Sequence, residues 1–243
     1  MIEVLESKRV LVTGGSRGLG RAMCRSFVRH GARVAFTWAR HADDANALLA
    51  ELPGTRAFQV DVLDTAGTEQ MVRTLETEWG GIDALVNNAG ITQALPLALL
   101  EEEDWDRVMD VNVKGTYLTS RAAIRGMIRR KKGVILNLGS LAGERILEAP
   151  IHYCASKAAI AGMTRAMAKE VARHGVRVLC LAPGLLEDGV GKNIPEHRRD
   201  DYLHHCALGR LGTLDEIAEL AAYLLSDDCA YMTGERIIAD GGV

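Results

Sequence analysis

Short apolar runs alternate with longer stretches of mixed polarity along most of the chain. The stretch RVLVT at residues 9–13 contains a continuous apolar run, which is typical of a strand buried on both faces. Further strands are expected at RVAFT (33–37), AFQVDV (57–62), ALVNN (84–88), GVILNLG (133–139), VRVLCLA (176–182) and RIIAD (236–240). Helical patterns separate these runs: one reaches about His30, and the others cover about 43–51, 65–79, 101–130, 152–174 and 215–226.

This alternation determines the expected fold class. Parallel strands joined by right-handed helical crossovers form a sheet that is covered by helices on both faces. We therefore expect an α/β protein with a doubly wound parallel sheet of about seven strands, in one domain over residues 1–243. Ligands of such sheets bind beyond the carboxyl ends of the strands, so the loops after the strands should contain the chemistry.

Composition and charge exclude several classes of protein. The net charge of -3 argues against general nucleic-acid binding, which needs a broad basic surface. No apolar run approaches the roughly 18 residues of a membrane span, and the amino terminus MIEVLESKRV has no signal-peptide core. Scattered cysteines favour reduced thiols in a cytoplasmic protein over a disulfide framework. These cysteines are Cys24, Cys154, Cys180, Cys206 and Cys229.

The first strand is followed by a glycine-rich turn, TGGSRGLGR, that leads into a helix. Gly14, Gly18 and Gly20 leave room for backbone N–H groups to approach a diphosphate at the helix amino end. An ordinary glycine-rich turn is the alternative. The order of strand, turn and helix favours a dinucleotide site.

The end of the second strand indicates which dinucleotide binds. An NAD site usually has an acid there that holds the ribose 2′-hydroxyl, but RVAFTWARH has none before Asp43. Arg17 and Arg40 are suited to a 2′-phosphate, although each is also compatible with a solvated surface arginine. Together with the missing acid they favour NADP(H).

Tyr153 and Lys157 lie four residues apart in IHYCASKAAIAG, a helical pattern rich in small residues. Positions i and i+4 share one face of a helix, so the phenol and the ammonium should be neighbours. A tyrosine packed in the core and a lysine in solvent would give the same pattern. The pair therefore decides nothing by itself.

Several motifs, in order over nearly the whole chain, resemble the short-chain dehydrogenase/reductase family. They are TGGSRGLG, Asp61–Val62, NNAG at 87–90, Asn112 in VNVKG, Ser140 thirteen residues before Tyr153, Tyr153 with Lys157, and Pro183–Gly184. Each motif is weak alone, but the ordered set is specific. The resemblance implies a Rossmann-type fold and an NADP-dependent oxidoreductase acting on a ketone or alcohol.

The resemblance also implies the catalytic roles. Ser140 would polarise the carbonyl oxygen, Tyr153 would donate the proton, and Asn112 would hold a water that links Lys157 to solvent. Lys157 would bind the ribose and lower the pKa of Tyr153, and a shift of about 3 units from 10 corresponds to roughly 4 kcal/mol. Ser140 as a turn hydroxyl and Asn112 as a local helix bond are the structural alternatives.

The same resemblance assigns a set of cofactor contacts. They are Gly14, Ser16, Arg17, Gly18, Leu19, Gly20, Arg40, Asp61, Val62, Asn88, Ala89, Gly90, Tyr153, Lys157, Pro183 and Gly184. Asp188 stands at the family's usual threonine position, and a carboxylate near a diphosphate is repulsive, so it is given no cofactor role. Gly189 and Gly191 would permit a different loop path. Residues 185–210 are expected to form a mobile substrate lid.

Metal catalysis has little support in the sequence. His204-His205-Cys206 is the nearest cluster, but the chain has neither HExxH nor paired CxxC, so a surface tract is the better interpretation.

Within the family, the strongest resemblance is to 3-oxoacyl-acyl-carrier-protein reductases. It implies an acidic acyl carrier protein as partner, docking at Arg129 and Arg173, and a homotetramer packed through the long helices and carboxyl-terminal strands. Cations that complement helix dipoles are the alternative for these arginines. A reductase of a free ketone, sugar or polyol, and a catalytically silent nucleotide-sensing protein, remain alternative functions. The sequence leaves acyl length and pathway open.

Overall fold

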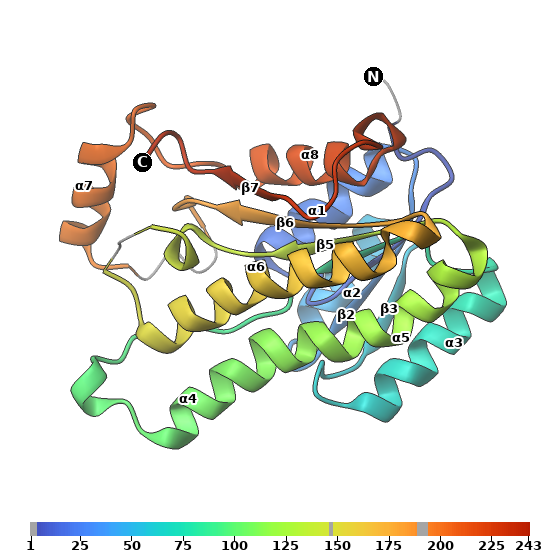
Figure 1. Ribbon diagram of the computed structural model, residues 1–243, viewed down its shortest axis with the longest axis horizontal. Helices are drawn as coiled ribbons and strands as arrows, with labels where there is room; N and C mark the ends of the chain where they lie inside the picture. The colour runs from blue at the N-terminus through green and yellow to red at the C-terminus, as the bar shows by residue number, and fades with distance from the viewer. Residues whose placement is uncertain (1–3, 146–147, 189–193) are drawn as a thin grey trace.

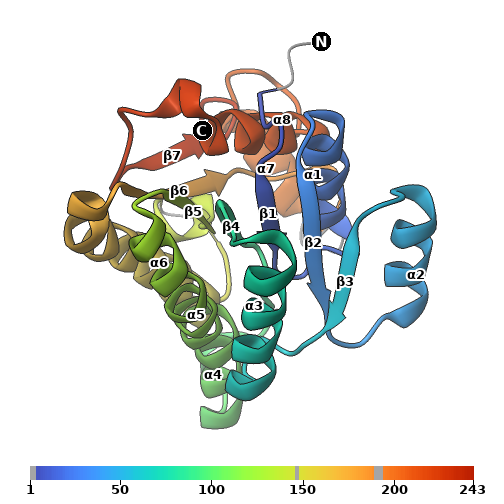
Figure 2. The same ribbon diagram turned by 90° about the vertical axis from the view of Figure 1, so that its right-hand side faces the viewer.

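A parallel β-sheet runs through the middle of the molecule (Figures 1 and 2). The computed structural model describes residues 4–145, 148–188 and 194–243. Within these residues seven strands are hydrogen-bonded in the order β3-β2-β1-β4-β5-β6-β7, and every pair is parallel. The strands are β1 (Arg9–Val12), β2 (Arg33–Trp38), β3 (Arg56–Gln59), β4 (Ala84–Asn87), β5 (Gly133–Leu138), β6 (Val176–Pro183) and β7 (Arg236–Ala239). The predicted α/β class is confirmed.

Helices cover both faces of the sheet (Figure 2). The buried cluster on one face takes residues from α1 (Gly18–Arg29), α2 (Ala42–Glu51) and α8 (Leu214–Leu225). The cluster on the other face takes residues from α3 (Thr65–Trp79), α5 (Gly115–Arg130) and α6 (Ile151–Val171). The remaining helices are α4 (Glu102–Met109) and α7 (Glu196–His205), and short turns are η1 (Leu97–Leu99), η3 (Leu141–Gly143), η4 (Ala172–His174) and η6 (Asp227–Cys229).

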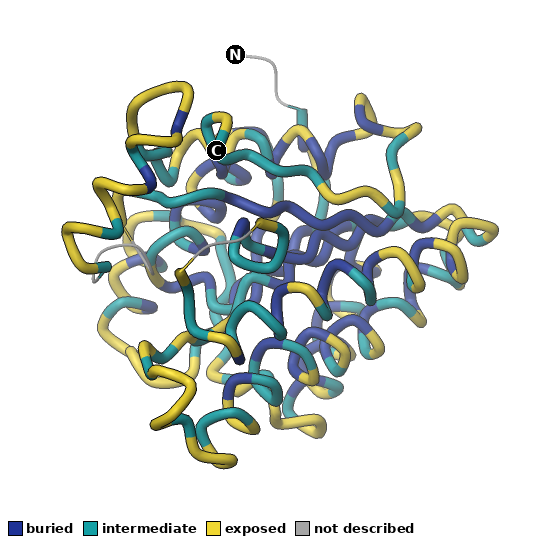
Figure 3. The backbone as a smooth tube through the Cα atoms, turned by 60° about the vertical axis from the view of Figure 1, so that its left-hand side comes forward, coloured by how far each residue is buried: buried dark blue, intermediate teal, exposed yellow. Residues whose placement is uncertain are grey.

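The central strands are buried on both faces, as the apolar runs predict (Figure 3). In β1, Val10 and Val12 pack into the cluster of α1 and α8, whereas Leu11 packs into the cluster of α3 and α5. Successive strand residues point to opposite faces, so one continuous apolar run supplies both layers of the core.

Two helical features differ from the predicted elements. The pattern at 101–130 is three elements, because a π-helical turn, η2 (Asp110–Lys114), separates α4 from α5. Helix α7 lies within the predicted lid and was not expected. Its sequence, EHRRDDYLHH, is polar, and Tyr202 is its one buried residue, so it lacks the apolar period that identifies a helix. Gly189 and Gly191 lie outside the described residues.

A row of buried polar side chains, on the face covered by α5 and α6, links these two helices to β4 and β5 just behind the carboxyl edge of the sheet. Asn87 and Asn137 are register partners on β4 and β5, and Asn87 Nδ2 donates to Asn137 Oδ1 (2.8 Å) and to Ser120 Oγ on α5 (2.8 Å). Asn137 Nδ2 donates to Thr164 Oγ1 on α6 (2.9 Å). These bonds fix α5 and α6 against the two strands whose ends lead into the catalytic loops.

Replacing Asn137 by alanine should destabilise the protein by about 2–3 kcal/mol, because one buried N–H of Asn87 and the hydroxyl of Thr164 each lose a partner. Urea unfolding followed by circular dichroism measures the change. Thr77→Ala, which removes an exposed hydroxyl bonded to Arg73 O, is the matched control and should change stability by less than about 0.5 kcal/mol. Equal effects of the two substitutions would contradict a structural role for this buried row.

Candidate active site

The strand order changes direction between β1 and β4. Strands β2 and β3 are added on one side of β1, and strands β4 to β7 are added on the other side. Loops after β1 and β4 diverge at such a point, and ligands of doubly wound sheets bind there. The sequence motifs gather at this edge: the glycine turn follows β1, NNAG ends β4, Ser140 follows β5 and Gly184 follows β6.

The glycine turn is braced by the loop after β4. Asn88 Nδ2 donates to Thr13 O and to Gly14 O (3.0 Å each), and Thr13 Oγ1 accepts from the backbone N–H groups of Asn88 and Ala89 (3.0 Å each). Gly14 has φ +64°, and a Cβ there would lie 3.1 Å from Ala89 Cα. A Cβ at Gly20 would clash with Gly14 O. Both glycines are therefore required by close packing.

The amino end of α1 is free to bind an anion. Its N-cap residue, Arg17, makes no side-chain cap bond, and the first turn contains no acid. By contrast, Asp64 caps α3 by accepting from Gly67 N (2.9 Å). The uncapped N–H groups of α1 and the side-chain-free turn before it fit the diphosphate of a dinucleotide.

Residues predicted for the adenosine end line the loops after β1, β2 and β3. Arg40 is exposed after β2, and Arg17 is exposed in the glycine turn after β1. Asp61 Oδ1 accepts from the backbone N–H of Leu63 (3.0 Å), and Val62 packs against Gly115 at the start of α5, where a Cβ would lie 2.6 Å from Val62 Cγ2. The structure thus brings the predicted contacts to one edge of the sheet.

The three predicted reactive side chains meet at the same edge. Tyr153 and Lys157 lie one turn apart on α6, with Lys157 Nζ 5.6 Å from the centroid of the Tyr153 ring. Ser140 follows β5, and its side chain lies close enough to the Tyr153 phenol to lower the pKa of that group. Lys157 is buried and donates from Nζ to Leu138 O (2.7 Å). The predicted juxtaposition of a serine, a tyrosine and a lysine is present.

Burial controls the ionisation of this group. Burial raises the pKa of Tyr153, and the nearby Ser140 hydroxyl offsets only part of that rise. Burial lowers the pKa of Lys157 to about 8. In the chain by itself burial keeps the pKa of Tyr153 above its usual value, and the Lys157 ammonium donates to Leu138 O, so a lowering of the Tyr153 pKa by Lys157 stays a prediction.

Asn112 joins the loop after β4 to the helix that carries Tyr153. It is fully buried in the π-helical turn, where its Oδ1 accepts from Ile91 N (2.8 Å) and its Nδ2 donates to Ile91 O and Ser156 Oγ (2.9 Å each). Ser156 Oγ in turn donates to Tyr153 O (2.8 Å). Sequence reasoning gave no role to Ile91 or Ser156, since nothing in their spacing marks them.

The space between Asn112 and Lys157 is kept open by a glycine. A Cβ at Gly90 would lie 3.1 Å from Asn112 Oδ1 and 3.7 Å from Lys157 Nζ. Both side-chain N–H groups of Asn112 are already used within the protein. A water between Asn112 and Lys157 stays a prediction, and only Oδ1 has a lone pair left for it.

A family model described as enoyl-(acyl carrier protein) reductase matches residues 14–243. The 3-oxoacyl-(acyl-carrier-protein) reductases FabG of Vibrio harveyi and Escherichia coli K12 are 37% and 35% identical to this chain, over 98% of each sequence. The crystal structure of gox2181 aligns with a TM-score of 0.92 at 29% identity, covering 99% of this chain and 97% of that one. The chain belongs to the short-chain dehydrogenase/reductase family.

The short-chain dehydrogenase/reductase family consists of oxidoreductases that use NAD(P)H, in agreement with the glycine turn and the Ser140–Tyr153–Lys157 group.

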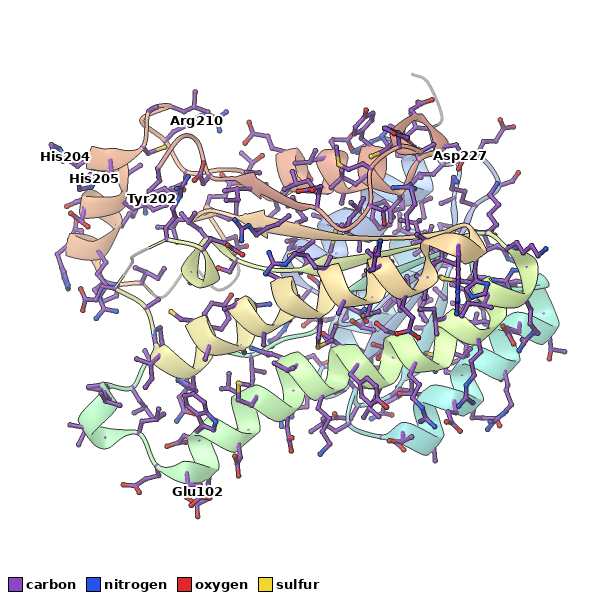
Figure 4. All side chains as sticks on the ribbon, viewed as in Figure 1. Glu102, Tyr202, His204, His205, Arg210 and Asp227 are labelled. Atoms are coloured by element: carbon purple, nitrogen blue, oxygen red, sulfur yellow. The ribbon has the colours of Figure 1, made fainter. Side chains whose placement is uncertain are left out.

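The base of the expected lid is tied to the carboxyl-terminal segment in this member. Gly184 N donates to Ala239 O (2.9 Å), and Tyr202 Oη on α7 donates to Asp240 O (2.6 Å). Tyr202 lies on the inner side of α7 (Figure 4).

The histidine cluster on α7 has no arrangement that would hold a metal. His204 and His205 are exposed on the outer side of the helix, whereas Cys206 is buried (Figure 4). The part of the chain that the structure describes contains no group of three or more metal-ligating side chains. Within the same residues no helix is long and apolar enough to cross a membrane.

The arginines predicted to dock a carrier lie far from the catalytic edge of their own chain. Arg129 is at the carboxyl end of α5 and Arg173 is in η4 after α6, so both lie at the edge where β5 and β6 begin. Arg129 Nη2 is paired with Glu76 (3.0 Å), and Arg173 Nε donates to His174 Nε2 (3.2 Å). The two arginines therefore do not lie beside the active site of their own chain, and docking stays a prediction.

His152 is a buried residue to which the sequence assigned no role. It precedes Tyr153 in the first turn of α6 and is 0% exposed, and neither ring nitrogen has a hydrogen-bond partner among the described residues. Burial lowers its pKa, and the charge of Asp104 on α4 opposes that change. The cost of burial makes the neutral ring the stable form in the folded protein.

Stability should therefore fall in acid. In the unfolded chain the imidazole has its ordinary pKa of about 6.5, so below that pH the unfolded state takes up a proton that the folded state excludes. The free energy of unfolding should fall by up to about 1.4 kcal/mol per pH unit between pH 6.5 and the lowered value. Urea unfolding at several pH values should give a shallower slope for His152→Gln.

Replacement of an exposed histidine, His197→Gln, should leave the slope of the wild-type protein unchanged. If His152→Gln and the wild-type protein lost stability in parallel, the buried ring would not be the source of the acid sensitivity.

Proposed function

We propose that the chain reduces a 3-oxoacyl group carried on acyl carrier protein to the 3-hydroxyacyl product, with NADPH as reductant. The observation that carries this proposal is the Tyr153 side chain, next to Ser140 and one turn from buried Lys157, at the edge where the glycine turn lies. Such a group suits a reaction in which a carbonyl oxygen gains charge and then a proton. Relatives at 35–37% identity that are named 3-oxoacyl-(acyl-carrier-protein) reductase support the same substrate class.

The residues of the chain divide the work at the carbonyl oxygen. NADPH, when bound, supplies the hydride. Ser140 donates a hydrogen bond to the oxygen and stabilises its developing charge. Tyr153 keeps its proton at neutral pH because burial raises its pKa, and it transfers that proton to the oxygen as charge develops. Lys157, with a pKa of about 8, carries a positive charge at neutral pH that stabilises the resulting phenolate.

The choice of NADP(H) over NAD(H) is supported by the end of β2. The strand ends at Trp38 with no acid to hold a ribose 2′-hydroxyl, and Arg17 and Arg40 are exposed beside it. A cytoplasmic location agrees with the five free cysteines and belongs to the same proposal.

Replacement of Tyr153 by phenylalanine should lower kcat/KM for the 3-oxoacyl substrate by about 10²–10⁴-fold, the usual contribution of a general acid. NADPH binding should stay within about twofold, because the phenol acts on the substrate oxygen. Turnover is followed by NADPH absorbance with acetoacetyl-carrier, acetoacetyl-thioester, crotonyl-thioester and free cyclic ketones. Tyr231→Phe, at a fully exposed tyrosine, is the matched control and should retain full activity.

Each outcome of this panel points to one reaction. Turnover of acetoacetyl substrates alone supports the proposal, turnover of the crotonyl substrate would indicate an enoyl reductase, and turnover of free ketones alone would indicate a small-molecule reductase. Activity of Tyr153→Phe above about a tenth of the wild-type value would remove Tyr153 from the mechanism.

Carrier docking at Arg129 and Arg173 requires a second copy of the chain. A carrier bound at the edge where β5 and β6 begin serves a neighbour's site when the α4–α5 segments of two copies pack antiparallel. The charges of this segment favour that arrangement, since it begins with acids at residues 101–104 and ends with bases at residues 129–132. We propose that the chain assembles into a homotetramer and that two of its copies pack in this way.

The double substitution Arg129→Ala with Arg173→Ala should raise KM for acetoacetyl-carrier by about tenfold and leave KM for the small thioester unchanged. Added salt should have the same selective effect on the wild-type protein, because exposed charges are screened. Arg25→Ala is the control, since Arg25 is also an exposed arginine paired with a glutamate, Glu51. Equal effects on both substrates would contradict docking at these arginines.

A further inference from the structure

A histidine that the sequence left unassigned contacts the cofactor turn. His41 follows β2, and its Nε2 lies 2.9 Å from Nη1 of Arg17. A guanidinium group only donates hydrogen bonds, so the imidazole nitrogen must accept. In this contact Nε2 of His41 therefore carries no proton.

The other charged groups at this corner are arranged around Arg17 and His41. Arg40 is exposed next to His41. On α1, Arg21 turns away to Ser16 O (2.8 Å) and to Asp44 of α2, whose Oδ1 lies 3.4 Å from Arg21 Nη2. Among the described residues, neither Arg17 nor Arg40 has a carboxylate within ion-pair distance.

Two further acids belong to the neighbouring elements. Asp43 is exposed in the first turn of α2, and Asp61 in the loop after β3 accepts from Leu63 N (3.0 Å). His41 is the N-cap residue of α2 and makes no side-chain cap bond, so its ring is not used to end that helix. The corner therefore holds two arginines without acids and one imidazole whose role in the free chain is to accept from one of them.

We propose that His41 binds the 2′-phosphate of NADPH together with Arg17 and Arg40, and that it takes up a proton when NADPH binds. This inference rests on the NADP(H) preference in the proposed function. Phosphate oxygens only accept hydrogen bonds, so Arg17 must turn from His41 to the phosphate. The Nε2 lone pair that faces Arg17 would repel the phosphate. A neutral ring with its proton on Nε2 donates one hydrogen bond, whereas the imidazolium donates the same bond and also attracts the dianion by its charge.

The proton taken up from solvent goes to Nε2 of His41, and no bond to the cofactor forms. In the free chain a protonated His41 would be a second cation beside Arg17, and the two charges would repel each other. A phosphate dianion between them removes that repulsion. Linkage is reciprocal, so if NADPH favours the protonated ring, lower pH must favour NADPH. NADH has no 2′-phosphate, so it leaves the contact of Arg17 with His41 in place and takes up no proton.

The test is the pH dependence of binding, measured on the whole protein without substrate. Dissociation constants for NADPH and NADH are obtained from nicotinamide fluorescence between pH 6 and 8.5, for the wild-type protein and for His41→Gln. Glutamine keeps a neutral donor and acceptor but does not titrate. We expect His41→Gln to weaken NADPH binding by about tenfold at pH 6 and by less than about twofold at pH 8.5. NADH binding should not change.

Calorimetry counts the proton directly. At pH 7.5 the 2′-phosphate is already mostly a dianion, since its second pKa is about 6. Titrations in buffers of different ionisation enthalpy should then show uptake of up to about one proton per NADPH by the wild-type protein and almost none by His41→Gln. His174→Gln, at the opposite edge of the sheet, is the control and should behave as the wild-type protein does.

The outcomes separate this inference from the cofactor proposal. If NADPH is preferred but His41→Gln shows the wild-type pH dependence and proton count, the inference fails and the NADP(H) preference stands. If His41→Gln binds NADPH more tightly at every pH, His41 only holds Arg17 in the free chain, and the inference again fails. If NADH binds as tightly as NADPH to the wild-type protein, the cofactor preference itself fails.

Discussion

The side chain of Asn112 makes three hydrogen bonds inside the protein, and the geometry of the catalytic edge depends on them. Two bonds hold Ile91, in the loop after β4, and the third holds Ser156, whose hydroxyl is bonded to the backbone of Tyr153. The loop after β4 also braces the glycine turn through Asn88. One buried amide therefore fixes the distance between the cofactor side and the proton donor. The π-helical turn between α4 and α5 is the backbone feature that places it there.

Loss of hydration sets the protonation states at this edge. Tyr153 keeps its proton because burial raises its pKa, and Lys157 titrates near 8 because burial lowers its pKa. His152, next to Tyr153, is held neutral for the same reason. A proton donor that is neutral at rest, beside an ammonium that is easily discharged, is suited to proton transfer near neutral pH. Burial of His152 is also expected to lower the stability of the protein in acid. The first turns of α6 therefore affect both proton transfer and stability.

The polar features of the two sheet edges differ in kind. At the carboxyl ends of the strands Lys157, Asn112 and the glycine turn are buried or held by hydrogen bonds, which suits chemistry that needs fixed geometry. At the opposite edge the charges of Arg129 and Arg173 are exposed, which suits encounter with a charged partner more than catalysis. One chain therefore contains both a reaction centre and a charged surface, but it keeps them apart. The proposed carrier docking at these arginines therefore requires a second copy of the chain.

The sequence by itself determined the strands of the sheet and the residues that make up the candidate site. Apolar runs such as RVLVT specify strands buried on both faces, and the order of the glycine turn, Ser140, Tyr153 and Lys157 specifies which loops meet. The tertiary structure decided the helix α7, the contact of Arg17 with His41, the burial of His152 and the direction of the Tyr153 pKa. The local hydrophobic pattern predicts which strands are buried. The hydration and hydrogen bonding of a side chain instead depend on residues far away in the sequence. For that reason the pattern identified the reacting groups, and only packing settled their charges.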